Sequence, residues 1–156
     1  MWDVTCTPKT RDEAEAWISF FMKLDGVYGT FLLGDNTRKA LRGVGGGTPL
    51  VKGANQEGNV LETDGWPHGV TGVVADGDWI QLPGYRHHRI CGAANSDGSG
   101  NATLTIYPRL RESPADNAAI TVANTVGLYR MLTNDSNIDI GTDTNVSVQF
   151  TAVEAL

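Results

Sequence analysis

The sequence is poor in charge, in cysteine and in long hydrophobic runs, and each shortage argues against a class of protein. Twelve basic side chains stand against eighteen acidic ones, which gives a net charge of −6. Nucleic-acid binding requires clustered Lys and Arg side chains that neutralise phosphates, and the densest basic stretch, 86–89, is too short to form such a surface. We therefore expect no specific nucleic-acid binding.

The chain also lacks a run of about 18 apolar residues and a signal-peptide pattern, so we expect a soluble protein with no membrane span and no export. Its two cysteines, Cys6 and Cys91, are isolated and lack CxxC spacing. A disulfide between them stays open as an alternative, although two buried free thiols in a reducing cytosol are the favoured interpretation.

Turn residues, by contrast, are abundant. Nineteen glycines, with many Thr, Asn and Asp residues between short apolar segments, are typical of a β-rich chain with frequent turns. A length of 156 residues suits one domain, or one domain with an inserted lobe, and is enough to bury a core without disulfides. The fold class that we predict is mainly β with one short α-helix.

The clearest local pattern predicts a helix at 11–24. Thr10 and Glu13 fit a capping box, in which the glutamate reaches back to the threonine amide. Gly26 is placed to adopt the left-handed conformation that ends the helix. We expect the apolar stripe of this helix to pack on a strand at 28–33. The stripe, at helical spacing, consists of Ala14, Trp17, Ile18, Phe21 and Leu24.

Alternation of apolar and polar residues at 2–6 and at 145–153 predicts a half-buried strand near each end of the chain. The second of these strands is expected to pair with the first or with 28–33. Such pairing would build an outer barrel-like or sandwich-like lobe from both chain ends, residues 1–47 and 123–156.

Residues 48–122 are predicted to form an inserted small β-barrel, carried on the flexible glycine stretch 43–47. Strand-forming segments alternate there with turns such as Asp76–Asp78. The strands expected from this spacing, together with one that follows the lobe, are 48–52, 60–64, 72–75, 79–82, 86–91, 102–107, 119–122 and 128–132.

Two fragments resemble metal sites, but a structural role is the favoured interpretation of each. His68 and the adjacent His87 and His88 could ligate a metal, yet neighbours on one strand point to opposite faces. We expect surface or interface histidines instead. The loop at 97–101 resembles a calcium loop but lacks the bidentate glutamate, since position 108 is proline, so a plain hairpin loop is expected.

Carboxylates paired at Asp76 and Asp78, and at Glu62 and Asp64, are expected to be turn residues rather than a glycosidase pair. No serine lies in a nucleophile elbow, and the glycine stretch 43–47 lacks the Lys and the Ser or Thr of a phosphate loop. We therefore predict no catalytic residue, no metal site and no cofactor.

Three stretches of the chain carry a family resemblance. The first is RDEAEAWISFFMKLDGVYGTFLLGD at 11–35. The second is GTPLV at 47–51, followed by TDGW at 63–66. The third is GDWIQL at 77–82, followed by SDGSGNATLTIYPRLRESPADNAAITV at 96–122. In residues, order and spacing, these blocks resemble a family of tailed-bacteriophage tail-tip proteins, the distal-tail or minor-tail proteins of long-tailed phages.

This resemblance implies a structural protein of the virion tail, assembled in the bacterial host cytoplasm and without enzymatic activity. The protein would form a ring around the DNA channel, between the tail tube and the host-facing tip or baseplate, with a hexamer favoured over a trimer. Expected partners are further copies of the chain, the tail tube protein, the tail hub or other tip proteins, and the tape-measure protein. Related chains carry additional sequence before the strand at 2–6, so a short natural form and a truncated chain both stay open.

The residues expected to carry folding and assembly are Trp2, Trp17, Phe21, Tyr28, Phe31, Asp35, Trp66 and Trp79.

A carbohydrate-binding β module is the alternative from a different class, with Trp66, Trp79 and Tyr85 stacking on sugar rings. Trp66 lies between a glycine and a proline and is expected to be more exposed than Trp79, which lies in a strand. A glycosidase that uses Asp76 or Glu62 is a third and more distant hypothesis.

Overall fold

Strands in two sheets and one α-helix account for the regular structure of the described residues, so the predicted mainly β fold with one short helix is confirmed. The computed structural model describes residues 1–134, 137–140 and 146–155. Within these ranges, the side chains of 6–9 and 137–140 are not described.

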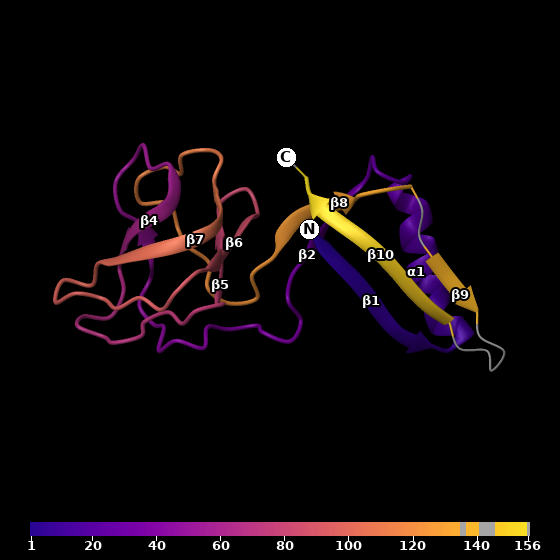
Figure 1. Cartoon of the computed structure of the whole chain (residues 1–156), viewed down its shortest axis with the longest axis horizontal. Helices are drawn as coiled ribbons and strands as arrows, with labels where there is room; N and C mark the ends of the chain where they lie inside the picture. Colours follow the sequence, from indigo (N-terminus) through magenta and orange to yellow (C-terminus); the bar gives the residue numbers. More distant parts are fainter. Residues whose placement is uncertain (135–136, 141–145, 156) are drawn as a thin grey trace. The chain divides into compact units, whose positions relative to one another are not determined.

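The chain divides into two compact units (Figure 1). The first unit consists of 1–33 and 128–156 and so contains both ends of the chain, whereas the second is the continuous segment 34–127. The glycine stretch 43–47, expected as a hinge at a lobe boundary, lies inside the second unit. Two of its amides donate to backbone carbonyl oxygens of residues 72–73, both at 2.9 Å.

The sheet of the first unit is built around its last strand. The strand order is β1-β10-β8-β2, and β9 also pairs with β10. β1 runs antiparallel to β10, with Trp2 opposite Ala152, which confirms the predicted pairing of the final strand with the strand at 2–6. The bounds of these strands are β1 Trp2–Lys9, β2 Thr30–Leu33, β8 Gly127–Met131, β9 Asn137–Ile140 and β10 Val146–Glu154.

The helix α1 spans Arg11–Leu24, the range that the sequence predicts. The Glu13 carboxylate accepts hydrogen bonds from the amide and the hydroxyl of Thr10, both at 3.2 Å, at the predicted capping box. At the C-terminus, Gly26 takes the predicted left-handed conformation at φ 66°, and Asp25 before it also takes this conformation, at φ 51°. Aspartate tolerates this conformation since its short polar side chain can hydrogen-bond locally.

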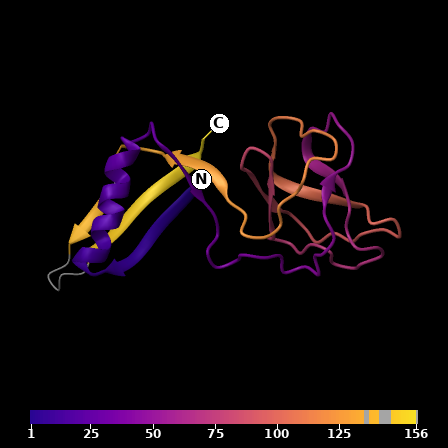
Figure 2. The ribbon, with the colours of Figure 1, turned by 180° about the vertical axis from the view of Figure 1, so that it is seen from behind.

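The apolar stripe of α1 packs on one face of the sheet (Figure 2). Phe21 is buried and meets Phe150 of β10 edge to face, with 5.1 Å between ring centroids. Phe20 meets Phe31 of β2 in the same way at 5.5 Å. Trp17 is only half-buried and stacks on Phe21. The helix therefore packs on the central strand β10 as well as on the strand that follows it.

The sheet of the second unit curls into a half-barrel with the order β3-β4-β7-β6-β5. The segment 117–121 joins its two end strands: the Asn117 amide donates to Val51 in β3, and Thr121 exchanges two hydrogen bonds with Gln81 in β5, all at 2.9 Å. The bounds are β3 Leu50–Val51, β4 Gly58–Asp64, β5 Trp79–Leu82, β6 Arg86–Ile90 and β7 Ala102–Leu110. Every strand contributes to the core, which includes Val51, Leu61, Ile80, Ile90, Leu104 and Ile106.

Two of the expected strands, 72–75 and 119–122, are not regular strands. Each makes only isolated bridges, such as Val74 with Ala94. These segments are apolar because Val74 and Ile120 are buried in the core of the half-barrel, and burial of side chains does not require a continuous ladder of backbone hydrogen bonds. Conversely, β9 was not predicted.

The packing of α1 predicts unequal effects of two substitutions. Phe21→Ala removes a fully enclosed ring and should lower the free energy of unfolding by about 3–5 kcal/mol. Trp17→Ala should lower it by less, because this side chain keeps partial contact with solvent. Urea denaturation of both variants, followed by circular dichroism, measures the difference. No loss for Phe21→Ala would show that α1 is peripheral to the first unit, and equal losses would contradict the difference in burial between the two side chains.

Candidate functional site

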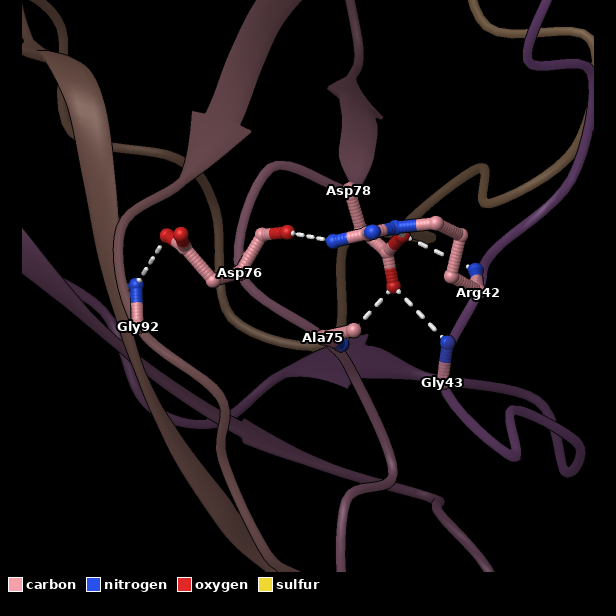
Figure 3. A network of polar contacts seen from close by, with 6 residues as sticks. All are labelled: Arg42, Gly43, Ala75, Asp76, Asp78 and Gly92. Carbon is pink, nitrogen blue, oxygen red and sulfur yellow. Dashed lines mark hydrogen bonds and ion pairs between the residues drawn. The ribbon is translucent and has the colours of Figure 1, made fainter.

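A network of polar contacts in the second unit centres on the carboxylate of Asp78, directly before β5 (Figure 3). Asp78 is 2% exposed. It accepts the backbone amides of Arg42, Gly43 and Ala75 at 2.8, 3.1 and 2.8 Å. The Arg42 side chain lies 3.8 Å from the same carboxylate. A buried charge is tolerated when it is hydrogen-bonded and paired, and this one holds the segment 42–43 against the turn before β5.

Asp76 extends the network on the exposed side of that turn. Its carboxylate accepts the Gly92 amide at 2.8 Å, and its carbonyl oxygen accepts a hydrogen bond from the Arg42 guanidinium. Both carboxylates therefore fasten backbone segments together. Glu62, the other candidate acid, accepts the Thr103 hydroxyl on β7. These contacts support structural roles for the carboxylates rather than an acid and base pair.

A second cluster lies on the hairpin formed by β5 and β6. Trp79 stacks on His87, with 4.3 Å between ring centroids and 21° between ring planes, and the Arg89 guanidinium lies 5.5 Å from the centre of the Trp79 ring. His87 is 2% exposed, and its Nε2 lies 3.1 Å from the Thr125 hydroxyl. Burial, and then repulsion from His88, lowers the pKa of His87 to about 4. His87 is consequently neutral at pH 7.

The prediction of surface or interface histidines at 87–88 is therefore wrong. His88 is 4% exposed, and its Nδ1 lies 2.8 Å from the Pro108 carbonyl oxygen. Buried imidazoles need such partners, and sequence spacing cannot reveal them because they come from distant segments. No group of three His, Cys, Asp or Glu side chains able to hold a metal ion occurs within the described residues.

In the loop at 97–101, residues of the loop itself donate hydrogen bonds to the Asp97 carboxylate. Asp97 accepts the Ser99 and Asn101 amides at 2.7 and 2.9 Å and the Asn101 side chain at 2.8 Å. These three donors hold the pKa of Asp97 down to about 2, with the Asn101 side chain contributing most. The arrangement agrees with the expected hairpin loop.

The two tryptophans proposed for sugar stacking have the opposite exposure from the prediction. Trp66 is 2% exposed, and its indole donates to the Thr63 hydroxyl at 2.8 Å, whereas Trp79 is half-buried. The Trp66 backbone lies against Gly100, where a Cβ atom would collide with the Trp66 carbonyl oxygen. The Trp66 ring belongs to the core of the second unit, so it offers no platform for a sugar.

Cys91 also differs from the prediction of two buried thiols. It is a free and exposed cysteine, whereas the Cys6 side chain lies outside the described residues.

The candidate assembly residues of the first unit fall into two groups. Phe21 is buried in the core, and Trp17 and Phe31 are half-buried and pack against it. Trp2 is also half-buried, and its indole donates to the Tyr129 hydroxyl at 3.0 Å. Tyr28 is 83% exposed, because the strand expected at 28–33 begins only at Thr30. Sequence alternation did not separate these groups, since an exposed aromatic and a buried one look the same in a short segment.

Asp35, the remaining candidate, lies in the second unit. Its carboxylate accepts the Thr37 hydroxyl at 2.5 Å and the Thr37 amide at 2.9 Å, and it also bonds the Trp79 side chain. These hydrogen bonds, that from the Thr37 hydroxyl above all, lower the pKa of Asp35.

The edges of the first sheet are a feature that sequence analysis did not locate in full. β1 and β2 are the end strands of the order β1-β10-β8-β2, and no strand among the described residues continues the sheet beyond either. Leu32 in β2 is 49% exposed. The exposure of Leu32 could have been inferred from the sequence, because alternation along Thr30–Leu33 places Leu32 on the face opposite to Phe31.

No protein-family model matches this chain, and a comparison with curated proteins found no significant match. Among the described residues, no helix combines the length and the apolar character needed to cross a membrane.

Removal of the Asp78 charge should weaken the second unit. Asp78→Asn replaces a buried carboxylate that serves three amides, and hydrogen bonds to charged groups contribute about 1.5–3 kcal/mol each, so we expect a loss of roughly 2–3 kcal/mol in unfolding free energy. Asp76→Asn is the matched control, with one amide partner at an exposed position. Thermal and urea denaturation would contradict this account if both variants lost the same stability.

The lowered pKa of Asp97 predicts that acid reduces the stability of the folded protein. Since the folded pKa of Asp97 is below its ordinary value, its contribution to stability is complete above about pH 4 and is lost as the pH falls towards 2. Asn101→Ala should raise the pKa of Asp97 towards 3.8, the ordinary value. Carboxyl ¹³C NMR during an acid titration measures the change, with Asn59→Ala, outside this loop, as the control. An unchanged Asp97 pKa in Asn101→Ala would refute the assigned cause.

Proposed function

We propose that this chain is a structural component of a bacteriophage tail tip that assembles into a symmetric ring. The ring would join the tail tube to the host-facing tip or baseplate and surround the DNA channel. The family resemblance motivates the proposal, and the observation in the structure that supports it best is the pair of end strands, β1 and β2, in the sheet of the first unit.

A strand at the edge of a sheet presents unpaired N–H and C=O groups that can pair with another chain. β1 and β2 are different strands, so pairing of β1 in one copy with β2 in the next is a head-to-tail contact. Head-to-tail contacts generate closed rings when the rotation from copy to copy closes. A sheet with two different edges thus supplies both halves of a ring interface.

Exposed apolar side chains support β2 as one of these halves. Leu32 is 49% exposed on β2, and Tyr28, 83% exposed, lies just before it. Tyrosine at an interface combines a large apolar ring with a hydroxyl, and it is among the residues that contribute most to association.

The charge of the first unit suits a position beside DNA that must move. Its residues include four basic and nine acidic side chains in the sequence. A ring built from this unit would repel the phosphate backbone weakly and would not hold the genome by ion pairs. Its neighbours would be the tail tube protein, the hub or other tip proteins, and the tape-measure protein.

Electron microscopy of intact particles tests the location and the ring directly. A symmetric ring at the tail tip, into which the two units fit, is the expected result. Reconstructed tips in which no density fits this chain would reject the proposal.

The edge contact has its own test in Leu32→Lys. The long charged side chain should leave the isolated protein folded, since the Leu32 side chain is largely exposed, but it should block ring assembly in particles. Val44→Lys is the matched control, because Val44 is an exposed apolar residue of the second unit, at 70%. Normal assembly of Leu32→Lys would exclude β2 as part of the interface.

A further inference from the structure

The segments by which the chain enters and leaves the second unit lie together. We call residues 34–40 the entry segment and residues 121–126 the exit segment. The Asn124 amide donates to the Lys39 carbonyl oxygen at 2.7 Å, and Ala40 and Ala123 form an antiparallel bridge. The two segments therefore run in opposite directions and support one another.

Two residues of the β5–β6 hairpin, Gln81 and His87, form hydrogen bonds with three residues of the exit segment. The backbone of Gln81 exchanges two hydrogen bonds with Thr121, and the side-chain oxygen of Gln81 accepts the Val126 amide at 2.9 Å. The His87 ring adds a third attachment, with its Nε2 at 3.1 Å from the Thr125 hydroxyl. Backbone and side-chain bonds thus fix the exit segment at several points.

The entry segment is attached to the same hairpin through Asp35. This carboxylate bonds the Trp79 side chain, and the Trp79 ring stacks on His87 at 4.3 Å between centroids. His87 consequently touches the exit segment directly and reaches the entry segment through Trp79. One buried imidazole connects both segments to the hairpin.

The surroundings of His87 oppose a positive charge on its ring. The ring is 2% exposed, so an added proton would have to be accommodated without bulk water. The next two residues of its own strand are the ionisable His88 and the cationic Arg89. The Arg89 guanidinium lies 5.5 Å from the centre of the Trp79 ring. Asp35 in the entry segment is the acidic group that favours protonation of His87. The Arg38 cation also interacts with the Asp35 carboxylate.

We propose that His87 is an acid-sensitive latch, whose protonation loosens the entry and exit segments from the β5–β6 hairpin. The neutral ring packs against Trp79 and bonds Thr125, whereas the charged ring must gain solvent. It can do so only by separating from the segments that cover it. The Asp78 network anchors residues 42–43 independently, so the loosening of the entry segment ends before residue 42.

This behaviour follows the sign of the His87 equilibrium. Burial lowers the pKa of His87 to about 4, below its ordinary value of 6.5, so the folded state takes up this proton only in acid. The latch is closed above that pH and opens as the pH falls through it.

An NMR titration of the whole chain from pH 8 to pH 3 tests the latch. In the wild-type protein, the His87 ring signals should shift with a midpoint near 4, and the amide signals of the entry and exit segments should shift with the same midpoint. A His87 ring that titrates near 6.5, or segment amides that stay unchanged through its transition, would overturn the proposal.

His87→Gln separates this effect from the titration of Asp35. Glutamine keeps a polar end for Thr125 but carries no proton equilibrium, so the exit-segment amides should lose their acid transition. His68→Gln, at an exposed histidine of the same unit, is the matched control and should retain the wild-type transition. Exit-segment amides that keep the wild-type midpoint in His87→Gln would assign the transition to another group and reject the latch.

Discussion

The pairing of β1 with β10 is the constraint on which the rest of the fold depends. It joins the first strand of the chain to the last, across the whole intervening sequence. Because residues 34–127 lie between the strands of this sheet, the chain must leave the first unit after β2 and return to it at β8. The second unit therefore has an entry and an exit that must run together, and the bridge between Ala40 and Ala123 meets that requirement.

The polar side chains of the second unit that sequence motifs bring to attention are used for holding backbone in place. The Asp78 carboxylate accepts three backbone amides, and the Asp97 carboxylate accepts two backbone amides and one side-chain amide. His87 forms a hydrogen bond with a hydroxyl group, and His88 forms one with a backbone carbonyl oxygen. The turns between the short strands of this unit leave backbone amides without a ladder partner, and carboxylates can satisfy several of them at once. Turn stabilisation thus explains why acidic residues cluster beside glycines.

Local patterns predicted what local physics determines. The capping box and the apolar stripe predicted α1 at both bounds, the turn at Asp76–Asp78 located β5, and alternation located the two terminal strands, whose pairing with each other was one of two alternatives. The errors share one cause, since each concerns contacts between distant segments. The buried Trp66 has Gly100 against its backbone, and the buried His87 ring contacts Thr125 of the exit segment. The exposure of a single side chain depends on tertiary contacts, which a short segment of sequence does not reveal.

The sheet edges proposed for assembly differ from the interior of the protein in what they offer a partner. Within the described residues, every buried side-chain nitrogen or oxygen has a hydrogen-bond partner, so the interior holds no polar group in need of a ligand. The proposed interface instead uses the backbone at the edges of the first sheet, where β1 and β2 end the strand order. Backbone pairing is indifferent to side-chain identity, which allows an interface to form without a conspicuous motif. A protein that functions by joining copies of itself can therefore have a sequence in which every recognisable motif is structural.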